Sequence, residues 1–206
     1  MPEGRIVLAT RNRHKIDELL RLLDVPGLVL EDLRGRDVPE VEEDGVTYEA
    51  NAIKKARAVA DATGLPALAD DSGLEVDALG GAPGVRSARY AGEASNDAAN
   101  RAKLLQALAG VPDERRTARF RCAIAIAIPH GSAMTVEAVC EGAIVRSERG
   151  AGGFGYDPLF VPESERETFA EMSDAKKDSL SHRGVAVRRA REVLTGLVLD
   201  TPSSGP

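Results

Sequence analysis

The sequence has few aromatic residues, few cysteines and no long apolar segment, and each shortage narrows what the protein can be. Its 206 residues include no tryptophan, three tyrosines, four phenylalanines and two cysteines. Cys122 and Cys140 each lie in an apolar, strand-like segment, so we expect reduced core thiols rather than a disulfide framework. The longest apolar segment, Cys122 to Pro129, is far too short to cross a membrane.

Basic residues are too few for a surface that binds nucleic acid. The chain has 27 Lys and Arg against 33 Asp and Glu, which gives a formal net charge of -6. Proteins that bind a polymer of phosphates show the opposite balance, so we expect no nucleic-acid partner. The first ten residues, MPEGRIVLAT, lack the basic and apolar regions of a signal peptide. We therefore expect a cytoplasmic protein without a membrane partner.

Strand-like apolar segments alternate with helical patterns along the chain, which is typical of an α/β fold. Residues 117–129 and 133–145 are two long strand-like segments joined by a short His-Gly-Ser connection, which predicts a hairpin and therefore a mixed sheet. The Pro-, Ser- and Gly-rich tail at 200–206 is expected to fray. The other expected strands lie at 5–10, near 28–30 and at 68–71, where Ser72 and Gly73 should end the strand, and the expected helices are 15–24, 48–63, 95–110, 174–180 and 184–194.

The segment LATRNRHK (8–15) carries the chain from the first strand into the first helix. Thr10 and Asn12 can form hydrogen bonds there, the first N–H groups of the helix point to the same place, and Lys15 adds a positive charge. Open α/β sheets bind ligands at such strand ends, so these groups could form an anion site. The alternative is an ordinary helix start with a solvated lysine, since the loop lacks the glycines of a Walker loop.

Two further segments are candidates for ligand binding. Phe154 and Tyr156 lie in the glycine-rich segment GAGGFGYDP (150–158), where an aromatic ring could stack on a nucleobase or could merely close the end of the sheet. The segment KKDSLSHRG (176–184) gathers basic and hydroxyl side chains at a helix entry. They could bind carbonyls or phosphates, or could form a solvated charged face.

Asp70 and Asp71 follow directly on a buried strand. Because neighbours on a strand point to opposite faces, both can face one site only if the strand ends there. Glu43, in the acidic segment VEEDG (41–45), offers a further carboxylate, and oxygen ligands of this kind suit Mg2+. The alternative is that Asp70 caps a turn while the acidic segment lies on the surface.

Taken in order, these motifs resemble the HAM1/ITPase family of non-canonical purine nucleoside triphosphate pyrophosphatases. The likeness runs through LATRNRHKIDEL, ANAIKKARA, LADDSGLEVDALGGAPGVRSARYAG, GGFGYDPLFVP and FAEMSDAKKDSLSHRG, and so spans nearly the whole chain. The resemblance implies a mixed α/β fold in which a single domain (1–206) has two lobes around an elongated sheet. It also implies a homodimer and the Mg2+-dependent release of pyrophosphate from ITP, dITP and XTP.

The resemblance assigns roles by position. It makes Asp71 the proton acceptor and makes Glu43 and Asp71 the metal ligands. Two residues depart from the family pattern: many relatives have Gly at Arg11, and relatives often have Glu at Ala50. The implied substrate contacts are Thr10, Arg11, Asn12, Arg13, His14, Lys15, Ser72, Phe154, Gly155, Tyr156, Asp157, Lys177, His182 and Arg183.

Two rival functions stay open from the sequence. A Maf-like nucleotide pyrophosphatase would share the phosphate chemistry but prefer another base. A non-enzymatic nucleotide-binding module would bind without turnover. If the chain is instead a pyrophosphatase for non-canonical purines, a hydrogen-bond donor must recognise the 6-keto oxygen of hypoxanthine or xanthine. Lys177 and Arg183 are the candidates.

Overall fold

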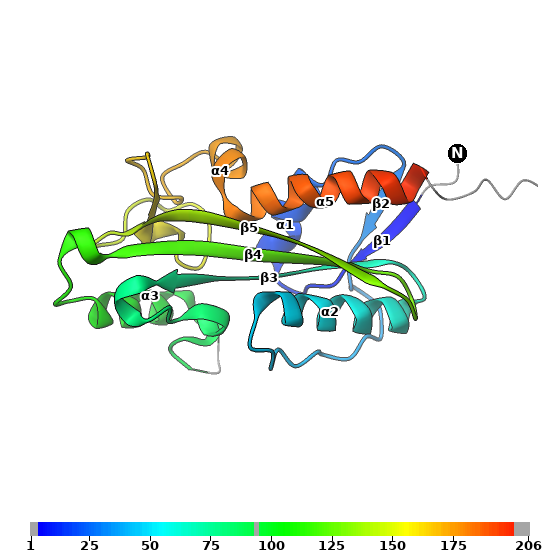
Figure 1. The fold of residues 1–206 in the computed structure, drawn as a ribbon, viewed down its shortest axis with the longest axis horizontal. Coiled ribbons are helices and arrows are strands. Elements are labelled where there is room, and N and C mark those ends of the chain that lie inside the picture. Colours follow the sequence, from blue (N-terminus) through cyan, green and yellow to red (C-terminus); the bar gives the residue numbers. More distant parts are fainter. Residues whose placement is uncertain (1–3, 93–94, 200–206) are drawn as a thin grey trace, which may run out of the picture. The chain divides into compact units, whose positions relative to one another are not determined.

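The structure is a computed structural model that describes residues 4–92 and 95–199. The expected frayed tail at 200–206 lies outside the described residues. In chain order the helices and strands are β1 (Gly4–Leu8), α1 (Arg13–Leu22), β2 (Leu28–Glu31), α2 (Tyr48–Thr63), β3 (Ala67–Val76), α3 (Asp97–Ala107), β4 (Thr117–Ala127), β5 (Ala133–Ile144), β6 (Phe160–Pro162), α4 (Asp174–Leu180) and α5 (His182–Leu199) (Figure 1).

The strands form a mixed sheet, which confirms the fold class expected from the sequence. Its six strands follow the order β2-β1-β3-β4-β5-β6. β1 pairs in parallel with β2 and with β3, whereas β5 pairs antiparallel with β6. The expected hairpin is also present, since β4 and β5 are neighbours in the sheet and only five residues separate them.

The described chain divides into two compact units. Unit 1 contains the residues up to Asp71, Ala123–Glu137 and the chain from Ala186 onward. Unit 2 contains Ser72–Cys122 and Ala138–Val185. Among residues 4–92 and 95–199, no helix is long and apolar enough to span a membrane. The assignment of the chain to a single domain with two lobes stays a prediction.

In unit 1, the pairing of β1 with β3 positions the loop that precedes α1. Leu8 is paired with Leu68, and the Ala9 amide donates to the Leu68 carbonyl at 2.7 Å. Because β3 continues past this point, the chain leaves β1 beside Asp70. The neighbouring helix α2 begins and ends as its sequence predicts: the Thr47 side chain caps its start, and Gly64 stops it with a φ of 67°.

Unit 2 has its own apolar core. Leu104 and Leu108, from α3 and the residue that caps it, pack in one cluster with aromatic side chains that include Phe120, Phe160 and Phe169. Phe160 and Phe169 are at most 1% exposed. The few aromatic residues of the chain are therefore concentrated in this unit rather than spread through both.

Several expected boundaries are wrong. β3 does not end at Ser72 and Gly73, because it lies between β1 and β4, whose backbones continue the sheet, and it runs to Val76. α1 starts at Arg13 and not at 15, because Asn12 caps it, and α5 starts at His182 and not at 184. α3 ends at Ala107, short of the expected 110.

Candidate functional site

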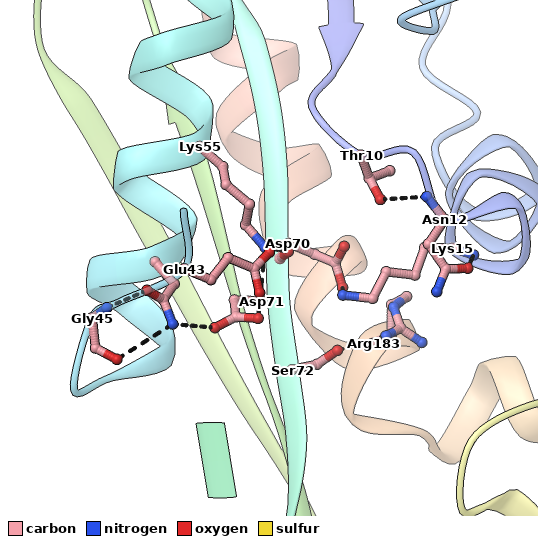
Figure 2. Close-up of polar contacts among 11 residues, drawn as sticks. Thr10, Asn12, Lys15, Glu43, Gly45, Lys55, Asp70, Asp71, Ser72 and Arg183 are labelled. Carbon is pink, nitrogen blue, oxygen red and sulfur yellow. Dashed lines mark hydrogen bonds and ion pairs between the residues drawn. The ribbon is translucent and has the colours of Figure 1, made fainter. Parts of the chain in front are cut away.

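The loop between β1 and α1 is ordered by its own polar side chains. Asn12 Oδ1 accepts a hydrogen bond from the Lys15 amide, and the Asn12 amide donates to Thr10 Oγ1, both at 3.2 Å (Figure 2). Arg13 and His14 are the exposed first residues of α1. A capped helix N-terminus presents backbone N–H groups to an anion, so the arrangement fits the expected anion site.

Arg11, which departs from the family pattern, links this loop to another segment of unit 1. Its Nη2 donates to the Val38 carbonyl oxygen at 2.5 Å. The guanidinium therefore ties the loop between β1 and α1 to Val38, which precedes the acidic segment in the chain. A glycine at this position could not form that contact.

Asp70 and Asp71 are held by lysines from different helices. Lys15 Nζ lies 3.1 Å from Asp70 Oδ2, and Lys55 Nζ lies 3.6 Å from Asp71 Oδ1. Figure 2 shows the two lysines approaching β3 from opposite sides. Both carboxylates are almost completely buried, at 1% and 5% exposure. The alternation of side chains along a continuing strand produces this separation.

Lys55 brings the two expected metal ligands to one ammonium group. Besides its contact with Asp71, its Nζ donates to Glu43 Oε1 at 2.7 Å and to the Asp70 carbonyl at 2.8 Å. Burial opposes the charged form of Lys55, but the negative charges of Asp71, Asp70 and Glu43 outweigh it and raise the pKa of the ammonium. Burial also raises the pKa of the Asp71 carboxyl, although Lys55 and Lys15 act against that change.

Asn51 holds Asp71 and the acidic segment together. Its Nδ2 donates to Asp71 Oδ2 at 3.0 Å, and its Oδ1 accepts from the Gly45 amide at 2.7 Å. Asn51 and Lys55 lie one turn apart on the buried face of α2. Neither is among the site residues that the sequence predicts. A charged side chain on the otherwise apolar face of a helix was the available signal for Lys55.

Carboxylate oxygens such as those of Glu43 and Asp71 are ligands that suit Mg2+. Within the part of the chain that the structure describes, no group of three or more His, Cys, Asp and Glu side chains could hold a metal alone. Mg2+ commonly uses one or two carboxylates with water and phosphate oxygens as its other ligands. Because both carboxylates already pair with the Lys55 ammonium, their environment is one that favours a cation.

In unit 2, Phe154 lies against two basic side chains. Lys177 Nζ lies 5.1 Å and Arg183 Cζ lies 5.4 Å from the centre of its ring. Arg183 Nη2 also donates to Ser72 Oγ at 2.7 Å. The structure thus brings together four of the expected substrate contacts, which lie far apart in the sequence.

Asp157 fixes the backbone of this aromatic segment. Its Oδ2 accepts from the Phe154 amide at 2.9 Å and from Lys177 Nζ at 2.7 Å. Gly153 precedes them with a φ of 69°, and a side chain there would overlap the Asp157 carboxylate. Asp157 is therefore a buried anchor for both Phe154 and one of its basic neighbours.

Tyr156 and His182 lie in the core of unit 2, each 4% exposed. The Tyr156 hydroxyl donates to the Ser87 carbonyl at 2.8 Å. The His182 ring stacks on Phe120 with centroids 4.6 Å apart. Their side chains hold the structure around the candidate site, and a substrate contact at either position stays a prediction.

Comparison with known proteins identifies the family. The chain matches the model of the Ham1 family over residues 6–193. The chain belongs to the Ham1 family. A relative from Desulforamulus reducens, a dITP/XTP pyrophosphatase, is 56% identical over 196 residues, which are 95% of this chain and 98% of that protein. A dITP/XTP pyrophosphatase from Geobacter sulfurreducens is 52% identical over 191 residues, 92% of this chain and 96% of that protein.

Solved structures of Ham1 proteins share the fold. The HAM1 protein of Coxiella burnetii has a TM-score of 0.85 and 44% sequence identity, covering 94% of this chain and 99% of that one. The Ham1 protein of Staphylococcus aureus has a TM-score of 0.84 and 37% sequence identity, and the match covers 94% of this chain and 100% of that one. These matches agree with the mixed α/β sheet described above.

Proposed function

We propose that this Ham1 protein hydrolyses non-canonical purine nucleoside triphosphates (ITP, dITP and XTP) to the monophosphate and pyrophosphate, and so clears them from the nucleotide pool. The observation that carries the proposal is sequence identity. Over more than nine-tenths of the chain, about half of the residues are identical to those of relatives named dITP/XTP pyrophosphatase. Two features also support it: the capped start of α1 in unit 1, and in unit 2 the Phe154 ring beside Lys177 and Arg183.

The residues of unit 1 would bind and hydrolyse the triphosphate. Lys15 and the N-terminus of α1 would balance the charge on the phosphates. Asp71 would accept a proton from a water molecule that attacks the α-phosphorus, and the bond to the bridging oxygen would break as pyrophosphate leaves. Asn51 and Lys55 would keep its carboxylate in place.

Glu43 and Asp71 would hold Mg2+. When bound, the metal would neutralise charge that develops on the phosphate oxygens. Lys55 pairs with the same two carboxylates, and its ammonium would turn to the phosphate chain when the metal takes its place.

The residues of unit 2 would recognise the base. Phe154 would stack on the purine, and Lys177 or Arg183 would donate to its 6-keto oxygen. Adenine has an amino group at that position, so its binding would leave a donor without an acceptor. Ser72 and Asp157 would orient these two basic side chains.

A panel of triphosphates assayed for pyrophosphate release tests the proposal. We expect ITP, dITP and XTP to be hydrolysed in preference to ATP and GTP when Mg2+ is present. A preference for other bases would favour a Maf-like enzyme, and binding without turnover would favour a nucleotide-binding module. Sedimentation of the purified chain tests the further proposal of a homodimer, and fractionation of cells tests the proposed cytoplasmic location.

A further inference from the structure

We propose that Asp97 and Arg101 on α3 are positioning residues that set the aromatic segment 153–157 through Gly155 and thereby control base selectivity. The Gly155 amide donates to Asp97 Oδ2 at 2.7 Å. Arg101 Nη1 donates to the Gly155 carbonyl oxygen at 2.9 Å. Two side chains one helical turn apart therefore hold both polar backbone groups of a single residue. The inference rests on the proposed stacking role of Phe154.

This clamp acts directly on the backbone next to the stacking ring. The Gly155 amide belongs to the peptide group that follows Phe154, and the Gly155 carbonyl belongs to the next one. Gly155 has a φ of 60°. Glycine adopts positive and negative φ about equally, so this residue does not hold its own conformation and depends on its hydrogen bonds. Asp157 holds the Phe154 amide. Three successive peptide groups around the ring are thus held by side chains.

The clamp is itself well supported. Arg101 Nε lies 3.0 Å from Glu148 Oε1, so the guanidinium bridges Glu148 and Gly155. Asn100 fastens the same helix to a neighbouring loop: its Nδ2 donates to the Ala88 carbonyl at 2.9 Å, and its Oδ1 accepts from the Ala91 amide at 2.7 Å. α3 can therefore serve as a fixed base for the aromatic segment.

Loss of the clamp should affect substrate selection more than the chemical step. The Phe154 ring contacts Lys177 and Arg183, so a shift of its backbone alters the stacking surface and the position of the ring relative to both donors. Neither Asp97 nor Arg101 is among the groups proposed for hydrolysis.

The test measures kcat and KM for pyrophosphate release from ITP and ATP in Asp97→Ala and Arg101→Ala. We expect KM for ITP to rise about five- to tenfold and the ratio of kcat/KM for ITP over ATP to fall by a similar factor, with kcat for ITP changed by less than about twofold. Asp97→Asn keeps an oxygen acceptor for the Gly155 amide and should stay within about twofold of the wild type in both quantities.

Lys103→Ala is the matched control. Lys103 lies on the same helix and its Nζ donates to the Tyr90 carbonyl at 2.5 Å, so its replacement removes a contact of α3 without touching Gly155 or the turn that carries Asp97. We expect unchanged KM and base ratio. The inference is overturned if Lys103→Ala shifts both quantities as far as Asp97→Ala does, or if Asp97→Ala leaves both unchanged.

Amide hydrogen exchange at Gly155, followed by NMR, tests the clamp without reference to turnover. Exchange should be about five- to tenfold faster in Asp97→Ala than in the wild type and unchanged in Lys103→Ala, because only the former loses the acceptor. Equal exchange in Asp97→Ala and wild type overturns the clamp. A wild-type protein that releases no pyrophosphate would instead overturn the proposed function, and the exchange result would still decide on the clamp.

Discussion

Asp70 and Asp71 are neighbours on β3, yet each pairs with a lysine from a different helix. Lys15 of α1 contacts Asp70, and Lys55 of α2 contacts Asp71. The adjacent acids therefore form two separate ion pairs, and only Asp71 shares its cation with the side chain of Glu43.

Replacing each acid with asparagine should separate their roles. Asp71→Asn keeps the size of the side chain but removes the proton acceptor, so we expect turnover of ITP to fall by about 10² to 10⁴. Asp70→Asn should lose less, because it weakens the pairing with Lys15 but leaves the proposed proton acceptor in place. Steady-state kinetics at saturating Mg2+ measures both, with matched melting curves to detect a change of stability. An active Asp71→Asn beside an inactive Asp70→Asn would reverse the assignment.

Lys55→Met should show that Glu43 and Asp71 need a cation. The variant leaves two carboxylates without their shared ammonium, and the loss of one partner of a buried ion pair costs about 3 kcal/mol of the free energy of unfolding. Mg2+ should restore more stability to this variant than to the wild type, because the ion supplies the missing charge. Urea unfolding with and without Mg2+ measures the effect.

Lys54→Met is the control for that experiment. Lys54 is the preceding residue, but it is 43% exposed in its side chain and pairs with Asp44 on the surface. Its replacement should leave the stability and the Mg2+ response nearly unchanged. A similar Mg2+ response in wild type, Lys54→Met and Lys55→Met would argue against a cation site at Glu43 and Asp71.

Glu43→Gln should raise the Mg2+ concentration required for half-maximal rate, because one charged oxygen ligand is lost. The adjacent, exposed Glu42→Gln is the matched control and should titrate like the wild type. Rates of pyrophosphate release over a series of Mg2+ concentrations give the comparison. Coinciding curves for Glu43→Gln and wild type would remove Glu43 from the metal site.

Base selection should depend on Phe154 and Arg183 in different ways. Phe154→Ala should weaken ITP binding by about 1 to 3 kcal/mol through lost stacking, and Phe154→Leu should recover only part of it. Arg183→Ala should reduce the preference for ITP over ATP. Competition binding and kcat/KM ratios measure the two effects. Unchanged discrimination in Arg183→Ala would place base recognition on another side chain.

Cys140 should make the stability depend on alkaline pH. Burial, with a smaller contribution from Glu141, raises the pKa of its thiol from 9.0 to about 11. The folded protein then keeps a proton that the unfolded chain releases, so the free energy of unfolding is unaffected below about pH 9 and falls as the pH rises towards 11. Relative to Cys140→Ala, the wild type should lose about 2 kcal/mol across this range. If the free energy of unfolding of wild type and Cys140→Ala changed equally between pH 9 and 11, the raised pKa of the thiol would be contradicted.

Local signals explain most of what the sequence predicts of the fold. Thr47 and Gly64 identify both ends of α2, because a cap and a left-handed glycine act through neighbouring backbone groups. Ser72 and Gly73 mislead because β3 is a central strand, and its neighbours outweigh the local preference for a turn.

The site is predicted less completely because its contacts are long-range. The sequence predicts Asp71 and Phe154 as site residues, but it does not show which side chains Lys55 contacts or that α3 holds Gly155. The Gly155 contacts join residues 54 and 58 positions apart, with no local periodicity to reveal them. For Lys55, the charge on the buried face of α2 was a usable signal.

The anchoring of the aromatic segment by Asp157 also limits how this enzyme could evolve or be engineered toward other bases. Any side chain at Gly153 would displace the carboxylate that holds both the Phe154 amide and Lys177. Libraries that seek a new base preference should therefore leave positions 153 and 157 unchanged. Substitutions at position 154 or along α3 can instead change the surface around the ring while Asp157 keeps its contacts.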